Sequence, residues 1–572
     1  MTLAANTTRH LLSLRNADGV WNGYLASSAL STATAVIALH ANGTDPDLTA
    51  RGRRWLAENQ NGDGGWGDTA RSVSNISTTA LCWAALPDGA VASRAQEWLV
   101  RVAGSTAPQA LAKAIADRYG KDRTFSVPIL TALTIGGRLG PDGWNRVPQL
   151  PFELAACPHQ WFQWLRLPVV SYALPALIAI GLARHRRRPV LGLSALRDAI
   201  TPRVLRTLRK IQPSGGGFLE ATPLTSFVSM SLTAAGLRDS EVSGRCLGFL
   251  RASIREDGSW PIDTNLSTWV TTLAINALDP EALGNREALA EWLLAQQFLE
   301  EHPYTHAAPG AWAWSNLPGA VPDADDTAGA LLALHRLGVR NDRVLAAVSR
   351  GIHWLLNLQN RDGGMPTFCR GWGHLPFDRS GADLTAHALR AWSAWRPQFG
   401  GSSIASRIDS AIPKAIHYLR QVQKSDGSWT PLWFGNQYAP GEENRTFGTA
   451  RVVVALRAFP EAAGAAARGV QWLLRAQNSD GGWGGAHGVE SSVEETSLAL
   501  AALAPDAPES VLQAGYHWLD ERTAHGTRFP CTPIGFYFAS LWYFEELYPV
   551  LFAASALQPV EDRLKLGVAA LE

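Results

Sequence analysis

Three aspartates stand close together near the middle of the chain, in the segment PDADDT. Asp323, Asp325 and Asp326 come directly before an apolar run, 328–334, with the composition of a core helix. Carboxylates crowded in an apolar environment cannot all ionise, because burial and mutual repulsion raise the pKa of at least one of them. We therefore expect one of these acids to be protonated at neutral pH and able to donate its proton.

The same residues also have a purely structural interpretation. Pro322 is typical of a helix boundary, and acids in a first helical turn are stabilised by the helix dipole by about 0.3–1 kcal/mol. That effect favours the charged form of a carboxyl. Burial and repulsion must therefore exceed it if the cluster is to hold a proton.

Aromatic residues point to the chemistry that this proton would start. The chain has 23 Trp but only 3 Met, and Trp312 and Trp314 come shortly before the acidic cluster. A desolvated cation gains roughly 0.5–2 kcal/mol over an aromatic face, and a bare ring does not trap the cation as a hydroxyl would. A protonated carboxyl beside such faces is what protonation-initiated carbocation chemistry on an alkene requires.

The elements that must position these residues are helical repeats. A glycine turn with the pattern Q-x-x-D-G-x-W, here called the Gln–Trp repeat, separates helix-like stretches whose apolar residues are three and four apart. Its spacing leaves room for two helices in each repeat, and strand-like alternation is nearly absent, so we predict an all-α fold. The full or nearly full copies are 60–66, 359–365, 423–429 and 477–483, and partial copies are 16–21, 212–218 and 255–260.

Length and composition exclude several classes of protein. A chain of 572 residues is too long for one small binding module, and 51 basic against 50 acidic residues give no field that would recruit nucleic acid. Five widely spaced cysteines favour a reducing compartment, so we expect a cytoplasmic protein. The apolar stretch 167–183 and the basic residues that follow to 188 predict either a buried helix or a peripheral membrane contact.

The Gln–Trp repeats in both halves, together with D-x-D-D-T-A at 323–328, resemble the squalene–hopene cyclases and related class II terpene cyclases. The resemblance covers nearly the whole chain. It implies two α/α-barrel (toroid) domains of helical hairpins with a cavity between them. We accordingly expect an inserted barrel at 11–255, and a catalytic barrel at 256–572 that residues 1–10 complete.

The resemblance also implies a catalytic group. Asp325 matches the family's proton donor, with Asp323 and Asp326 polarising it. The segment ADLTAHAL at 382–389 looks like the family's D-x-T-A-H helix, which implies that Asp383 and His387 lie beside the acid. From the residues alone, His387 could equally be an ordinary core histidine.

Eight aromatic residues are expected to bind the substrate, with ordinary core packing as the alternative for each. Trp312 is included because it precedes the acids, and the others, Trp314 among them, because they resemble family cavity or late-cation aromatics. The complete set is Trp164, Trp269, Trp312, Trp314, Trp433, Phe447, Phe529 and Phe536.

We expect an isoprenoid substrate, with squalene or a similar triterpene as the first choice and no cofactor. The rival is a C15 or C20 prenyl diphosphate, as in drimenyl and copalyl diphosphate synthases, which would need Mg²⁺. The insertion 436–445 lengthens a loop that the resemblance places at the cavity, so the sequence does not predict which cyclic product forms. Within this insertion, Glu442 and Glu443 could assist a metal or be ordinary loop residues. A homodimer is the candidate oligomer.

Two further classes stay open. A protein prenyltransferase subunit would share the barrel but hold zinc through Asp, Cys and His. A non-catalytic helical scaffold would need no carboxylates beside aromatic walls.

Overall fold

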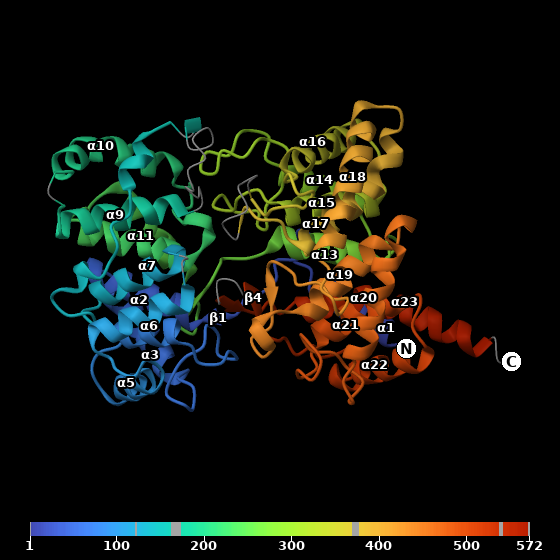
Figure 1. Ribbon diagram of the computed structural model, residues 1–572, viewed down its shortest axis with the longest axis horizontal. Helices are drawn as coiled ribbons and strands as arrows, with labels where there is room; N and C mark the ends of the chain where they lie inside the picture. Colours follow the sequence, from blue (N-terminus) through green and yellow to red (C-terminus); the bar gives the residue numbers. More distant parts are fainter. Residues whose placement is uncertain are drawn as a thin grey trace.

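The helices form two groups that lie side by side (Figure 1). In each group a ring of inner helices is surrounded by outer helices that pack against it. This confirms the predicted all-α fold of α/α-barrels. The computed structural model describes residues 2–120, 123–158, 160–161, 173–190, 192–368, 377–536 and 541–569.

The first ring is closed by α11, which packs against both α2 and α9. Its described inner helices are α2 (Ala29–Asn42), α4 (Ile76–Ala85), α7 (Arg123–Ile135), α9 (Leu174–Arg187) and α11 (Thr222–Ala234). Its described outer helices are α3 (Pro46–Glu58), α5 (Ala90–Ala103), α6 (Pro108–Tyr119), α10 (Ser194–Ile211) and α12 (Glu241–Ser253).

The second ring is closed by α23, which packs against both α13 and α21, and the N-terminal helix α1 covers the outside of α23. The described inner helices are α13 (Ser267–Ala277), α15 (Ala324–Leu337), α17 (Ala382–Trp395), α19 (Arg445–Leu456), α21 (Val493–Leu503) and α23 (Tyr548–Ala569). The described outer helices are α1 (Leu3–Ser13), α14 (Arg286–Ala295), α16 (Asp342–Leu358), α18 (Ser403–Gln421), α20 (Ala463–Ala476) and α22 (Glu509–Arg522).

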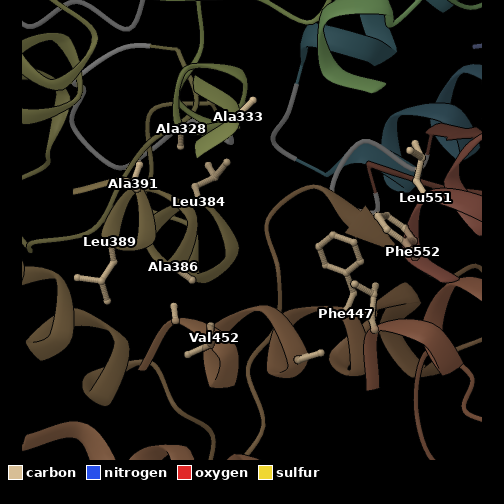
Figure 2. Close-up of a cluster of buried hydrophobic side chains, with 14 of the residues drawn as sticks. Ala328, Ala333, Leu384, Ala386, Leu389, Ala391, Phe447, Val452, Leu551 and Phe552 are labelled. Atoms are coloured by element: carbon tan, nitrogen blue, oxygen red, sulfur yellow. The ribbon is translucent and has the colours of Figure 1, made fainter. Parts of the chain in front are cut away.

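Inner and outer helices differ in how much of their circumference is apolar or small. The inner helix α17 is buried along nearly its whole length. The outer helix α16 buries Val344, Val348, Ile352 and Leu355, whose spacing of three or four residues makes one apolar stripe. A helix surrounded by protein must be apolar or small on every side, which explains the alternation of the two types along the chain. Figure 2 shows Ala328, Leu384 and Phe447 in the resulting core of the second ring.

Short strands and 3-10 turns join the helices. β1 (Ser27–Ser28) pairs antiparallel with β2 (Trp260–Pro261), and β3 (Phe434–Gly435), β4 (Ile534–Phe536) and β5 (Leu541–Tyr543) form an antiparallel sheet in that order. The described 3-10 turns are η1 (Gly143–Asn145), η2 (Phe152–Ala156), η4 (Phe218–Glu220), η5 (Arg396–Phe399), η6 (Pro440–Glu442) and η7 (Pro460–Ala462).

Each Gln–Trp repeat fastens one helical hairpin to the next. In the last copy, Gln477 Nε2 donates to Gly481 O at 2.9 Å and to Val511 O at 3.0 Å, on the following outer helix. The indole Nε1 of Trp483 donates to Leu473 O at 2.8 Å, at the end of the preceding helix. Gly481 has φ 92°, a conformation that L side chains rarely adopt. The glutamine and tryptophan of this repeat are therefore structural.

The structure adds one repeat that the sequence pattern does not reveal. Gln297 Nε2 donates to Gly310 O at 2.8 Å and to Ala347 O at 2.9 Å. Trp312 Nε1 donates to Leu293 O at 2.7 Å. A longer loop separates the glutamine from the glycine here, so the motif is not continuous. Trp312 thus occupies the structural position of a repeat tryptophan.

The chain passes between the two rings at two places, residues 14–28 and 254–266, and the paired strands β1 and β2 lie on these connections. Helix α1 continues to Ser13, three residues beyond the N-terminal segment 1–10 assigned to the catalytic barrel. Tyr304, Val321 and Phe377 of the second ring share a core with residues of the first. The division into 11–255 and 256–572 stays a prediction.

Helix α9 contains the described part of the stretch for which a membrane contact was considered. Ile178, Ala179, Ile180 and Leu182 are fully buried in the first ring, and residues 167–172 lie outside the described residues. Within the described ranges, none of the helices combines the length and the hydropathy needed for a membrane span.

Candidate active site

The acidic cluster forms the start of α15. Asp323 is the N-cap: its backbone is extended, and its Oδ1 accepts a hydrogen bond from the Asp326 N–H at 2.8 Å. The Thr327 hydroxyl donates to Asp323 O at 2.6 Å. The structural interpretation therefore holds for Asp323. Asp325 does not take part in this capping, so its carboxyl is available for another role.

Asp325 contacts the predicted histidine. Its Oδ1 lies 2.5 Å from Nδ1 of His387 on the neighbouring inner helix α17. The histidine side chain is 3% exposed, whereas that of Asp325 is 18% exposed. A hydrogen bond between these atoms holds one proton, and the partly exposed carboxyl can reach a bound molecule.

Burial dominates the electrostatics of the cluster. It raises the pKa of Asp323 to about 7, with the Asp325 charge as a further cause, and raises the pKa of Asp326 well above its usual range. Asp326 Oδ1 is buried without a hydrogen-bond partner. Burial also lowers the pKa of His387, although the Asp325 charge opposes that shift. The cluster thus holds protons at neutral pH beside an imidazole kept near its neutral form.

Asp383 lies in the first turn of α17. Its Oδ1 accepts from the Leu432 N–H at 2.9 Å, and its Oδ2 is buried without a partner. Burial raises the pKa of Asp383 to about 6, and the charge of Asp325 adds to the rise. The predicted catalytic residues are therefore together in space, at the N-terminal ends of α15 and α17.

Two arginines near this group were not predicted. Arg390 lies one helical turn beyond His387, and Arg451 lies on the next inner helix, α19. Neither forms an ion pair with another described residue. Burial lowers the pKa of both guanidiniums, that of Arg390 to about 10, and both charges lower the pKa of His387. An arginine within a helix that is otherwise apolar or small was the available signal in the sequence.

Two of the predicted tryptophans form an aromatic group with Phe368 and Phe377. The ring of Trp314 lies 6.3 Å from that of Phe368, and Trp433 lies 5.9 Å from Phe368 and 5.3 Å from Phe377. Trp433 Nε1 donates to Thr367 Oγ1 at 2.8 Å, and Thr367 O accepts from the N–H of the residue before Asp325 at 2.9 Å. Thr367 therefore ties this group to the acidic cluster.

A second aromatic group involves Phe447. Its ring stacks on Phe434 at 4.2 Å and lies 6.4 Å from Phe552. Tyr548 stacks on Phe552 at 5.6 Å. Phe434, Phe552 and Tyr548 were not predicted, because single aromatic residues in buried segments look like ordinary core.

The remaining predicted aromatics divide into three cases. Trp269 lies 6.0 Å from His387, edge to face, beside the acid. Phe529 stacks on His10 of α1 at 5.3 Å, and Trp312 belongs to the added repeat, so the structure gives both a packing role. The backbone of Phe536 in β4 pairs with that of Phe434 in β3, but the Phe536 side chain is not among those described. Trp164 lies outside the described residues.

The residues considered as metal ligands form ion pairs. Glu442 pairs with Arg118 at 2.8 Å, and Glu443 pairs with Lys424 and Arg445 at 3.0 Å each. Among the residues that the structure describes, no three His, Cys, Asp or Glu side chains gather as metal ligands would.

Comparisons with known proteins agree with this arrangement. Models of the squalene-hopene cyclase C-terminal and N-terminal domains match residues 266–499 and 4–113, more than half of the chain together. The terpene cyclase-glycosyl transferase fusion protein fsoA of Humicola fuscoatra is 26% identical over 88% of this chain, which spans 45% of that protein. Squalene hopane cyclase afumA of Aspergillus fumigatus is 25% identical over 85% of this chain and 77% of its own length.

Among solved structures, ent-copalyl diphosphate synthase from Streptomyces platensis has the same fold, with a TM-score of 0.56 at 20% identity over 98% of this chain and 99% of that chain. The chain belongs to the squalene–hopene cyclase-like family of class II terpene cyclases.

Proposed function

We propose that this chain is an isomerase that cyclises a linear polyprene, and that Asp325 starts the reaction by protonating a terminal alkene. The observation that carries the proposal is the 2.5 Å contact between the half-buried Asp325 and the buried His387, beside the carboxyls of Asp323 and Asp326, whose pKa values burial raises. Family membership supports the same chemistry.

The proposed first step moves one proton. Oδ1 of Asp325 is held by His387, which leaves Oδ2 to deliver the proton to the alkene. The π electrons of the alkene form the new C–H bond, and the cation that results is attacked by the next double bond. A hydrogen bond from the His387 ring stabilises the carboxylate left behind. Trp269, Trp314, Trp433 and the group around Phe447 supply the aromatic faces for the cations.

Squalene or a similar triterpene is the proposed substrate, and the similarity to the squalene hopane cyclase afumA supports it. A C15 or C20 prenyl diphosphate is the second candidate and would bring Mg²⁺. The ion pairs of Glu442 and Glu443 leave these residues poorly suited to hold that metal.

The test is an assay of the purified full chain with squalene, farnesyl diphosphate and geranylgeranyl diphosphate, the diphosphates with and without Mg²⁺. We expect cyclic isomers of squalene by mass spectrometry, and their loss by at least a thousand-fold in Asp325→Asn. Asp342→Asn is the matched control, because Asp342 is also a first-turn acid but begins the outer helix α16. Conversion of none of these substrates, or full activity of Asp325→Asn, would contradict the proposal.

We also propose that the protein is cytoplasmic, that it contacts a membrane peripherally through 167–188, and that it forms a homodimer. The exposed basic end of α9 supports the second of these, since Arg186, Arg187 and Arg188 are exposed. Vesicle flotation and light scattering of the purified chain test membrane contact and the oligomeric state.

A further inference from the structure

Two segments of the second ring are joined by a row of hydrogen bonds, here called the polar seam. One segment, 264–269, leads into α13, and the other, 314–319, runs from Trp314 toward the acidic cluster. Each segment carries one of the tryptophans to which the proposed function gives an aromatic face, Trp269 and Trp314. What holds the seam together therefore bears on where these two indoles lie.

The first part of the seam is a backbone contact at the start of α13. This helix begins after Leu266, which has no polar side chain to cap it. The Trp314 carbonyl accepts instead from the N–H groups of Thr268 and Trp269, at 3.0 and 3.1 Å. It thus takes the place of a capping side chain for two first-turn N–H groups. The backbones of Trp269 and Trp314 are therefore fixed to each other.

Side chains continue the seam beyond the tryptophans. The Ser315 hydroxyl donates to Asn265 Oδ1 at 2.8 Å, and the Ser267 hydroxyl donates to Asn316 Oδ1 at 2.9 Å. Ser267 Oγ also accepts from the Asn316 N–H at 3.3 Å. Ser267 and Ser315 are buried, so these hydrogen bonds are largely shielded from competing water.

Glu220 of the first ring holds the far end of the seam. Its Oε1 accepts from the Gly319 N–H at 2.7 Å, and its Oε2 accepts from the Thr264 hydroxyl at 3.1 Å. One buried carboxyl thus binds both segments. A Cβ at Gly319 would lie 2.5 Å from Glu220 Oε1, so only glycine leaves room for this close approach.

The chain adopts an unusual backbone to place this carboxyl. Leu219 and Glu220 have φ of 58° and 53°, two successive left-handed residues that are not glycine. The next residue, Ala221, pairs with Asp263 in an antiparallel bridge, which brings the first ring to the seam. Such conformations persist only where the surrounding structure holds them, and they often mark residues with a functional task.

The other end of the seam reaches the proton donor's partner. The Trp269 ring lies 6.0 Å from that of His387, edge to face. A Cβ at Gly329 of α15 would lie 3.5 Å from both Trp269 Cζ3 and His387 Cε1, so the indole packs where α15 and α17 meet. The Trp314 ring lies 6.3 Å from Phe368 in the first aromatic group. The seam therefore connects the aromatic face beside the acid to that group.

We propose that Glu220 is a positioning residue for the cyclisation, because it holds the polar seam closed and so fixes the spacing of Trp269 and Trp314. This inference rests on the proposed function, in which both indoles face the cations. Glu220 acts through its two hydrogen bonds and transfers no proton. The first ring thereby contributes a residue that acts on the reaction through the wall of the site.

The expected effect follows from what the two indoles do. An aromatic face attracts a cation more strongly than it attracts the neutral alkene that precedes it. Displaced indoles should therefore raise the energy of the cationic transition states more than that of the bound substrate, which lowers kcat more than it changes KM. A cation that is poorly held should also lose a proton before the later rings close.

The test compares Glu220→Ala and Glu220→Gln with the native full chain, on whichever polyprene the native enzyme converts. Alanine removes both acceptors, so we expect kcat to fall about ten-fold or more while KM stays within about three-fold. The ratio of incompletely cyclised to native product should rise about five-fold or more. Glutamine keeps an oxygen for the Gly319 N–H and can bond the Thr264 hydroxyl, so it should keep the native products and a kcat within about three-fold of native.

Thr264→Val tests the same contact from the other side. Valine has nearly the shape of threonine but lacks the hydroxyl that donates to Glu220 Oε2. We expect the product ratio to rise about two-fold or more, in the same direction as in Glu220→Ala. The effects of Glu220→Ala and Thr264→Val should not multiply in the double variant, because each breaks the same hydrogen bond. If Glu220→Ala does not fold, an unchanged product ratio in Thr264→Val overturns the proposal.

Glu561→Ala is the control for losing a buried carboxyl that joins separate segments. Glu561 Oε1 accepts from the Ala4 N–H at 3.0 Å and from Tyr516 OH at 2.9 Å, on α1 and α22. This variant should lower the Tm but keep the native products, and an equal product shift in it would mean that general loosening is the cause.

The remaining outcomes separate this inference from the proposed function. Native kcat and native products in Glu220→Ala overturn the role of Glu220 alone. A Glu220→Gln variant as impaired as Glu220→Ala would show that the charge matters rather than the two contacts, and this also overturns it. Failure of the native enzyme on every polyprene contradicts the proposed function itself.

Discussion

The Asp325–His387 contact works as a proton donor only while the imidazole is neutral. A protonated His387 would donate to Asp325 and hold it as a carboxylate, which has no proton for an alkene. Burial lowers the pKa of His387, and the charges of Arg451 and Arg390 lower it further, against the opposing effect of Asp325. The guanidiniums of Arg390 and Arg451, which form no ion pair with another described residue, thus favour the neutral form of His387.

This argument predicts a shift in pH dependence. Replacing Arg390 with Met removes one positive charge, so the pKa of His387 should rise and the imidazolium should form at a higher pH. We expect the acidic limb of the kcat profile to move up by at least half a pH unit in Arg390→Met. Arg390→Lys keeps the charge and should keep the native profile. A lower kcat with an unmoved acidic limb would show that Arg390 acts through packing alone.

Which site residues the sequence could predict depends on the kind of signal. Asp323, Asp325, Asp326, Asp383 and His387 stand in short motifs, so their proximity followed from a resemblance that spans both helices. Arg390 and Phe368 stand in no motif. Their contacts come from side chains that meet across separate segments, and neither spacing nor composition reports such distances.

At the scale of elements, the Gln–Trp repeats fasten together the helical hairpins whose inner helices carry the site residues. The repeat of Gln297 and Trp312 is the nearest one to the acids, because Trp312 O accepts from the Asp323 N–H at 3.1 Å. The sequence did not reveal this repeat, since a loop of extra residues stands between Gln297 and Gly310. A pattern with fixed spacing fails wherever the same contacts are made across an insertion.

The repeat can be tested at its glycine. Gly310 has φ 117°, and a Cβ there would lie 2.9 Å from Arg350 O. We expect Gly310→Ala to lower the free energy of unfolding by about 2–4 kcal/mol, from backbone strain and overpacking together, and to reduce activity by displacing Asp323. Gly284→Ala is the matched control, because Gly284 also has positive φ (72°) but nothing within 4 Å of its Cβ position. Equal losses in both variants would mean that the close approach is unimportant.

At the scale of the molecule, several carboxyls are buried where the rings meet or in the inner ring. Burial raises the pKa of Asp323 and Glu545 to about 7 and that of Glu494 to about 8. Glu545 accepts from the Tyr24 N–H at 2.6 Å, on the first connection between the rings, and its Oε2 has no partner. The two-ring assembly therefore buries acids that the unfolded chain would ionise near pH 4.

These raised pKa values fix how stability changes with pH. Between pH 4 and the folded pKa, the folded chain holds protons that the unfolded chain has released, so stability falls as pH rises, by about 1.4 kcal/mol per pH unit for each such group. Burial lowers the pKa of His302 to about 4, which has the opposite effect, but only below about pH 6.5. We therefore expect the Tm to fall from pH 6.5 to pH 8. Glu545→Gln should make the decline shallower, whereas the exposed Glu461→Gln should not, and a Tm that rises over this range would contradict the folded pKa values.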